Sequence, residues 1–495
     1  MKKIALLLLA ATFVIFSSCN QERNSYNMPQ KIIVAGKIDN YDPSREVVLA
    51  VNRAGFMQES IQVKTDSTGS FTTTFESYIP TDAYLVYKAN FLILLHLGDS
   101  LFVHFDGQYN DRQEILNTIK FGGNVAQTNQ YAAKFQQMYF SNELFHDWDK
   151  KDRAVRNYDV EQYIQYLDTV QQKSKELYDQ FVSENNPNAE SRKWAQLILE
   201  ENHNHQLASY ASGHRRANNM QPAWDVPLGF YDKLCNSLPI NHSMFIASSA
   251  LNTFINVFDR YISNKLKYSE TDITTVVDKD SIRIFSAIEF VSDPLLLQLM
   301  LTMGFDMDFL FKQNINNYER FHDVVNKYIK EPFLREPLQK KYLQTKLMLE
   351  SPQIYTETIL KEAANLSINW LVDEIFQQNK DKVIYVDFWA TWCAPCLAEF
   401  PNSKEVEHEF KDTDVVFVYL CLESEENQWK ATIDKFQLGG QHYHLSYKQS
   451  TEIRNLFDVR GVPEYLLIDK SGVIKEKGTH LRPLVVKDKI NEILK

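Results

Sequence analysis

Cysteine is scarce in this sequence, with five among 495 residues. Two of the five, Cys393 and Cys396, are nevertheless only two residues apart, in the segment "DFWATWCAPCLAEFP" (387–401). A structural zinc site takes four ligands, and the chain has no second cysteine pair to complete one. We therefore predict no metal here. The best substitute ligands for zinc are the histidine pairs 442/444 and 203/205.

Clusters of basic residues are also lacking. The formal net charge is −11 and the isoelectric point is about 5.6. Binding to nucleic acid depends on lysines and arginines gathered on one face, where they neutralise phosphates. We therefore expect no nucleic-acid partner.

The N-terminus has the pattern of an export signal. Lys2 and Lys3 precede the apolar run "IALLLLAATFVIF", which is too short for a confident membrane span of about 20 residues. Cys19 follows directly after "FSS", and the pattern resembles a bacterial lipoprotein signal whose cysteine receives lipid. We predict a signal over residues 1–19 and a polar tether over 20–30. An ordinary cleaved signal is the alternative.

Two further regions precede the cysteine pair. Residues 31–107 contain seven short runs rich in valine, isoleucine and phenylalanine, separated by turn residues, which predicts a small β-sandwich. Glycine then becomes rare, with five between residues 108 and 378, and apolar residues take helical spacing, as in "VEQYIQYLDTVQQKSKELYDQF" (160–181). We predict an all-helical region over residues 108–364.

The last region, residues 365–495, alternates strand and helix patterns. A helix expected over 356–378 leads to the strand "KVIYVDFW" (382–389) and the cysteine segment. A second strand, a helix, a hairpin and a final helix follow. This order predicts an α/β domain with a mixed sheet, and a multidomain α+β chain as a whole.

The cysteine pair is placed where a helix begins. A helix N-terminus offers free N–H groups and the positive end of a dipole, and both stabilise a thiolate. Cys393 thereby gains nucleophilicity and is the more exposed thiol. Cys396 lies nearly one turn deeper, where it can attack a mixed disulfide formed on Cys393. A redox dithiol is therefore favoured over a zinc half-site or a packing pair.

The segment "VDFWATWCAPCLAEFP" resembles the active-site segment of thioredoxin-fold proteins, most closely the exported TlpA/ResA-like thiol–disulfide oxidoreductases. A second matching motif, "GVPEYLLID" (461–469), lies downstream in the expected order. The resemblance implies a cis peptide bond between Val462 and Pro463 and contacts to substrate from these two residues and Trp392. It implies no cofactor beyond the dithiol.

Two acids compete for the proton transfers. Asp387 lies in an apolar strand, so we expect burial to raise its pKa and allow it to deprotonate Cys396 through water. An exposed acid at the strand end is the alternative. Glu399 resembles the acid of ResA-like proteins, or else complements the helix dipole.

The sequence departs from the family in three places. A helix is expected over 356–376 where many members have a β-hairpin. Glu464 follows Pro463 where threonine is common, and its carboxylate would oppose a thiolate on Cys393. The dipeptide Ala394-Pro395 differs from the usual thioredoxin pair, so the redox potential cannot be carried over.

These observations lead to one functional hypothesis and one alternative. The protein is expected to be a lipid-anchored oxidoreductase of the cell envelope (the periplasm) that reduces protein disulfides with electrons from an upstream reductant. The alternative is an envelope scaffold whose helical region binds a partner and whose dithiol is vestigial.

Overall fold

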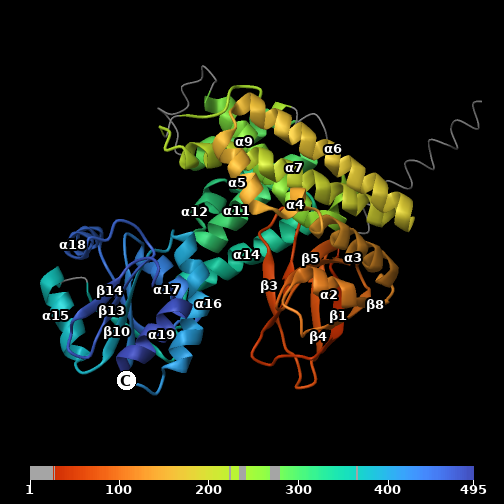
Figure 1. Ribbon diagram of the computed structural model, residues 1–495. Helices are drawn as coiled ribbons and strands as arrows, with labels where there is room; N and C mark the ends of the chain where they lie inside the picture. Colours follow the sequence, from red (N-terminus) through yellow and green to blue (C-terminus); the bar gives the residue numbers. More distant parts are fainter. Residues whose placement is uncertain are drawn as a thin grey trace, which may run out of the picture. The chain divides into compact units, whose positions relative to one another are not determined.

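The computed structural model describes residues 26, 28–221, 224–232, 241–267, 279–363 and 366–494 (Figure 1). The chain forms two compact units. The first comprises Met1–Gly304 and Asp323–Pro337, and the second comprises Phe305–His322 and Leu338–Lys495. Cys19, with its predicted lipid, and Cys235 lie outside the described residues.

The first unit contains a β-sandwich. One sheet has the order β4-β1-β7-β8 and the other the order β3-β2-β5-β6. Apolar residues from the facing sides of both sheets form one core, as alternating strand patterns require. The eighth strand lies within the region predicted to be helical. It pairs antiparallel with β7 and forms one edge of the first sheet. The strands are β1 (Gln30–Asp39), β2 (Val47–Val51), β3 (Glu59–Val63), β4 (Ser70–Ser77), β5 (Thr81–Val86), β6 (Asn90–Leu95), β7 (Ser100–Asp106) and β8 (Lys120–Gly123).

Helices make up most of the chain between residues 112 and 350. One helix, α11, is long and apolar enough to cross a membrane, but two-thirds of it is buried within the protein, as in a core helix. The helices are α2 (Arg112–Thr118), α3 (Ala126–Phe140), α4 (Glu143–His146), α5 (Trp148–Asn157), α6 (Val160–Asn185), α7 (Ala189–Ala217), η1 (His242–Ala247), α9 (Ser248–Lys267), α10 (Lys279–Phe290), α11 (Pro294–Phe311), α12 (Asn316–Arg320), α13 (His322–Tyr328) and α14 (Pro332–Glu350).

The sandwich and the helices of the first unit share buried polar contacts. Asp82 of β5 accepts hydrogen bonds from the backbone N–H (3.1 Å) and hydroxyl (2.6 Å) of Ser249 in α9. Burial raises the pKa of Asp82 to about 6, because no water solvates the carboxylate. The sandwich is therefore joined to the helices by specific hydrogen bonds as well as by packing.

The second unit contains a six-stranded sheet of order β14-β13-β10-β11-β12-β9. The central strand β10 pairs in parallel with β11 and antiparallel with β13. Figure 1 shows α15 and α18 on one side of the sheet and α16, α17 and α19 on the other. The strands are β9 (Thr358–Lys361), β10 (Val383–Trp389), β11 (Val415–Cys421), β12 (Gly440–His444), β13 (Glu464–Ile468) and β14 (Ile474–Lys477); the helices are α15 (Ile368–Gln378), α16 (Ala394–Glu409), α17 (Glu426–Phe436), α18 (Tyr447–Phe457) and α19 (Pro483–Leu494).

One predicted element is wrong in part. The single helix expected over residues 356–378 is the edge strand β9 followed by α15, which begins after its N-cap Ser367. Strand β9 pairs in parallel with β12, and this pairing supplies hydrogen bonds that the local sequence did not reveal. The segment therefore extends the sheet by one edge strand.

The fold class is confirmed: a β-rich N-terminal region, a helical region and a C-terminal α/β region. The boundaries 31–107, 108–364 and 365–495 remain a proposal.

Candidate functional site

The side chains of strand β10 pack into two cores, one on each face of the sheet. All seven residues are buried, as a central strand covered on both faces requires. Ile384, Val386 and Phe388 pack with α15 and α18. Tyr385 and Trp389 pack on the opposite face, in the core that contains the cysteine pair. Successive strand residues alternate between the faces, so Asp387 points to the cysteine side.

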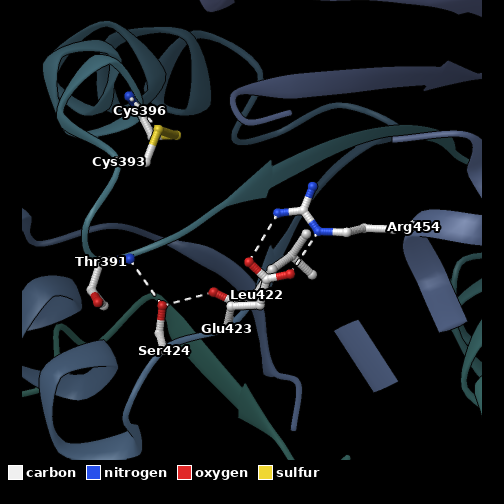
Figure 2. The surroundings of a disulfide bond; sticks show 7 residues. All are labelled: Thr391, Cys393, Cys396, Leu422, Glu423, Ser424 and Arg454. Carbon is white, nitrogen blue, oxygen red and sulfur yellow. Dashed lines mark hydrogen bonds and ion pairs between the residues drawn. A yellow bond between two sulfur atoms is a disulfide. The ribbon is translucent and has the colours of Figure 1, made fainter. Parts of the chain in front are cut away.

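The cysteine pair lies at the start of α16, as predicted. Cys393 is the N-cap residue, and its Sγ accepts a hydrogen bond from the backbone N–H of Cys396 at 3.2 Å. The two cysteines form a disulfide (Figure 2). Pro395 occupies the first turn, where a helix needs no backbone donor. The helix N-terminus thus faces the sulfur that the sequence marks as the nucleophile.

The expected difference in exposure between the two cysteines is not found in the oxidised form. Cys393 is 3% exposed and Cys396 is 1% exposed. Both sulfurs lie in the core between β10 and α16, because neighbouring apolar side chains cover the disulfide. In the oxidised form, the position at the helix start, and not exposure, distinguishes Cys393 from Cys396.

The turn before the cysteines is clamped to the loop after β11 (Figure 2). The backbone N–H of Thr391 donates to the hydroxyl of Ser424 at 3.0 Å, and that hydroxyl donates to the carbonyl of Leu422 at 2.8 Å. The indole N–H of Trp392 donates to the carbonyl of Glu423 at 2.9 Å, although half of the residue is exposed. These bonds fix the turn against the sheet.

An ion pair holds the other side of this loop. Both Nε and Nη2 of Arg454 in α18 donate to the carboxylate of Glu423, at 2.9 and 3.3 Å. Two donors on one carboxylate define its orientation. Neither residue was predicted from the sequence, since they are 31 residues apart.

Asp387 is buried, and neither of its carboxylate oxygens has a hydrogen-bond partner among the described residues. Burial raises the pKa of Asp387 well above its ordinary value, and the nearby acids Glu399 and Glu407 raise it further. The alternative of an exposed acid at the strand end is therefore wrong. A buried carboxyl on the cysteine side of the sheet is a suitable proton acceptor.

Glu399 projects from α16 and is also buried. Its Oε1 accepts a hydrogen bond from Nη1 of Arg482 at 2.6 Å, and its Oε2 accepts one from Asn402 at 3.1 Å. Arg482 directly precedes α19 and is 83 positions from Glu399 in the chain. Glu399 is thus held by a specific cation that no local sequence pattern indicates.

Glu407 is a third acid that sequence reasoning missed. It accepts hydrogen bonds from the hydroxyl of Tyr419 and from the backbone N–H of Gly439, the latter at 2.9 Å. Burial raises the pKa of Glu407 to about 7. The sequence contains a pattern that indicates Glu407, because residues 396, 399, 403 and 407 fall on one face of α16.

The second sequence motif lies beside the first. Phe388 of β10 pairs with Glu464 of β13, so Pro463 lies opposite the end of β10, where the cysteine turn begins. The Val462–Pro463 peptide bond is cis, as the resemblance implied. Glu464 lies 3.8 Å from the ammonium of Lys477, a cation that partly offsets the carboxylate expected to oppose the thiolate.

Two of the histidines considered as zinc ligands, His442 and His444, have other contacts. His442 is buried, stacks on Tyr419 and hydrogen bonds through Nε2 to the carbonyl of Gly439 at 2.6 Å. His444 hydrogen bonds through Nε2 to the carbonyl of Ser424 at 2.7 Å. Within the described ranges, no group of three potential metal ligands occurs.

The remaining thiol in this region is buried in strand β11. Burial raises the pKa of Cys421 to about 12, so this thiol is protonated at neutral pH. It packs among apolar side chains in the core that also contains the cysteine pair.

Comparison with known proteins identifies the C-terminal region. A family model described as thioredoxin-like matches residues 381–474, which contain both motifs. These residues form a thioredoxin-like domain. Relatives include the thiol-disulfide oxidoreductase ResA of Bacillus cereus, 29% identical over 119 residues, which are 24% of this chain and 67% of the relative. ResA of Oceanobacillus iheyensis is 30% identical over 95 residues, or 19% and 48% of the two chains.

Solved structures match a similar share of the chain. A putative thiol-disulfide oxidoreductase from Bacteroides vulgatus is 33% identical, with 24% of this chain and 78% of that chain covered and a TM-score of 0.22. The thioredoxin domain of another oxidoreductase from that species is 23% identical, with coverage of 24% and 84% and a TM-score of 0.23. The sequence relatives support oxidoreductase activity for the thioredoxin-like domain, and the two named here cover a quarter of the chain or less.

Proposed function

We propose that this protein is a thiol–disulfide oxidoreductase that reduces disulfides of envelope proteins through Cys393 and Cys396. The observation that carries the proposal is the placement of Cys393 as the N-cap of α16, in a disulfide with Cys396 and on the same side of the sheet as a buried acid. This arrangement supplies a nucleophile, a resolving thiol and a proton acceptor within one thioredoxin-like domain.

The reaction proceeds in two exchanges. In the reduced protein, the Cys393 thiolate attacks one sulfur of the substrate disulfide, and the other substrate sulfur leaves as a thiolate. Cys396 then loses its proton to Asp387 through water and attacks Sγ of Cys393. The second substrate thiolate leaves, and the Cys393–Cys396 disulfide forms. Two electrons pass from protein to substrate, and a dithiol reductant must restore them.

Substrate binding is proposed for the surface formed by Trp392, Val462 and Pro463. An extended peptide can lie against the backbone of the Val462–Pro463 loop in the manner of an added strand. Trp392 is half exposed while its indole N–H is held by the carbonyl of Glu423, so its ring offers a fixed apolar surface next to Cys393. These contacts would orient the substrate disulfide toward the helix start.

Trapping of mixed disulfides tests the mechanism. In a Cys396→Ser variant the resolving thiol is absent, and serine is too weak a nucleophile at neutral pH to replace it. Covalent adducts with client proteins should therefore accumulate and disappear on addition of reductant. The measurement is non-reducing electrophoresis of membrane extracts, with Cys393→Ser as the matched control that should trap little.

Two results would contradict this assignment. Equal trapping by both variants would mean that nucleophile and resolving thiol are assigned wrongly. Absence of adducts from both variants, together with no insulin disulfide reduction by the folded wild-type protein, would favour the alternative of a scaffold with a vestigial dithiol.

We also propose export and lipid attachment at Cys19, which follow from the signal-like pattern of residues 1–19. Replacing Cys19 by Ser should move the protein from the membrane fraction to the soluble fraction without changing the activity of the dithiol. Several acyl chains anchor a protein stably, whereas none remain in the variant. Fractionation followed by immunoblotting is the measurement, and a variant that still pellets with membranes would refute the lipid anchor.

A further inference from the structure

Helices α6 and α7 of the first unit are held together at both ends by aromatic contacts. Near one end, Tyr163 stacks on Tyr210 with ring centroids 4.0 Å apart. Near the other end, Phe135 of α3 packs edge-on against Phe181 and Trp194, at 5.2 and 5.7 Å. Such well-packed ends fix the separation of two long antiparallel helices. The middle of the pair is consequently unable to close by moving one helix alone.

A cavity of about 570 Å³ lies along this middle section. Its volume falls within the roughly 300–1,000 Å³ typical of small-molecule sites. Its floor includes the buried apolar side chains of Leu167, Leu199 and Leu207, and Phe230 borders it. The apolar floor can bury the hydrophobic part of a ligand.

Two side chains in the lining each have a buried oxygen atom without a hydrogen-bond partner among the described residues. Ser174 is buried, and no described residue hydrogen bonds to its hydroxyl. Glu200 accepts a hydrogen bond from Gln196 at Oε1, at 2.9 Å, while its buried Oε2 has no partner among the described residues. An unpaired buried carboxylate oxygen is costly, and a ligand that donates to it removes that cost.

The charges around the cavity favour a cation. Asp168 also lines the cavity, so two carboxylates face it from two helices. Lys175 lines the cavity as well, but its ammonium is paired with Asp179 at 2.5 Å. A cationic head can therefore approach Glu200 with attraction from a second acid.

We propose that the cavity between α6 and α7 binds a small molecule with an apolar body and an amine cation, whose head pairs with Glu200 and Ser174. The apolar body lies on the leucine floor. The ammonium donates to Oε2 of Glu200 and to the hydroxyl of Ser174. This binding function is separate from the dithiol, because the cavity and the cysteines belong to different compact units.

Three probes with the same indole body and different heads test the proposal on the full chain. Tryptamine carries an ammonium, tryptophol a hydroxyl and 3-indolepropionic acid a carboxylate. Isothermal titration should give the tightest binding for tryptamine, about tenfold or more above the other two, because a hydrogen bond to a charged group is stronger than a neutral one.

Substitution of the acid supplies the second part of the test. Glu200→Gln should reduce tryptamine affinity about tenfold or more and abolish the preference among the three probes, while its circular dichroism stays that of the wild type. The control Glu176→Gln removes an exposed acid of α6 that pairs with Lys173, and it should leave binding unchanged. Cys393→Ser should also bind as the wild type does.

Three outcomes would overturn the proposal. Equal affinity for the three probes would mean that the cavity binds the apolar body and does not recognise the head group. Unchanged tryptamine binding by Glu200→Gln would place the amine elsewhere. Absence of saturable binding by any probe to the folded wild-type protein would exclude an aryl-amine site of this size.

Discussion

At the scale of single residues, Asp387 is the acid with the greatest expected effect on both catalysis and stability. Its carboxyl is buried without a hydrogen-bond partner in the described part of the chain, and burial raises its pKa well above 3.8. The native state therefore keeps this proton to a higher pH than the unfolded chain, which releases it at about pH 4. Since the native state binds more protons, its stability falls as the pH rises from the unfolded pKa toward the folded pKa.

We predict that Asp387→Asn stabilises the protein at pH 7 and not below pH 4. The gain at pH 7 is about 1.4 kcal/mol for each unit between the unfolded pKa and the folded pKa, counted no further than pH 7. Insulin reduction should fall by about tenfold or more, because a positioned proton acceptor contributes roughly 10²-fold or more. Calorimetry of the full chain at both pH values, with parallel activity assays, is the measurement. An equal stability gain at both pH values would contradict the assigned pKa shift.

At the scale of elements, the turn between β10 and α16 depends on one hydroxyl in the loop after β11. Ser424 accepts from the backbone N–H of Thr391 and donates to the carbonyl of Leu422. We predict that Ser424→Ala lowers the free energy of local unfolding by about 1–3 kcal/mol, because the buried N–H of Thr391 loses its acceptor. Hydrogen exchange of peptides covering residues 383–400 measures this loss.

A matched control for this substitution is available on α18. Thr451 is exposed, and its hydroxyl donates only to the carbonyl of Tyr447 in its own helix. Thr451→Ala should change the same exchange rates little, since exposed substitutions are usually worth less than about 0.5 kcal/mol. Similar behaviour of the two variants would show that the turn does not depend on Ser424.

At the scale of the whole molecule, the thioredoxin-like domain contains its own cores. The buried residues of both cores, one on each face of the sheet, lie between residues 363 and 490. We predict that a fragment of residues 351–495 folds and reduces insulin at a rate within severalfold of the full chain. Circular dichroism and the reduction assay measure this. An unfolded fragment would show that the domain needs residues 305–322 and 338–350 of the same compact unit.

A small loss of stability in that fragment is expected from one contact. Lys435 of α17 donates to the carbonyl of Leu310 at 2.7 Å, and both residues belong to the second compact unit. Burial lowers the pKa of Lys435 to about 8. The fragment lacks Leu310, so the hydrogen bond of Lys435 to its carbonyl is lost. Water then solvates the ammonium of Lys435, and no buried charge remains.

The sequence by itself determined the elements whose signals are local. Apolar runs, helix caps and turn residues act within a few positions of the chain. They predicted the buried strand over 383–389, the helix start at the cysteines and the hairpin of β13 and β14. The same local patterns located Cys393, Cys396 and Asp387. Family resemblance, and not local physics, supplied the cis bond before Pro463.

Only the tertiary structure decided the features that depend on distant partners. Residues 358–361 form an edge strand because β12 offers hydrogen bonds, and local helical spacing could not reveal that partner. The pairing of Glu399 with Arg482 joins residues 83 positions apart. The cavity between α6 and α7 is lined by side chains of both helices and of residues 229 and 230. Each of these arises from contacts between segments far apart in the chain, where packing and charge outweigh local preference.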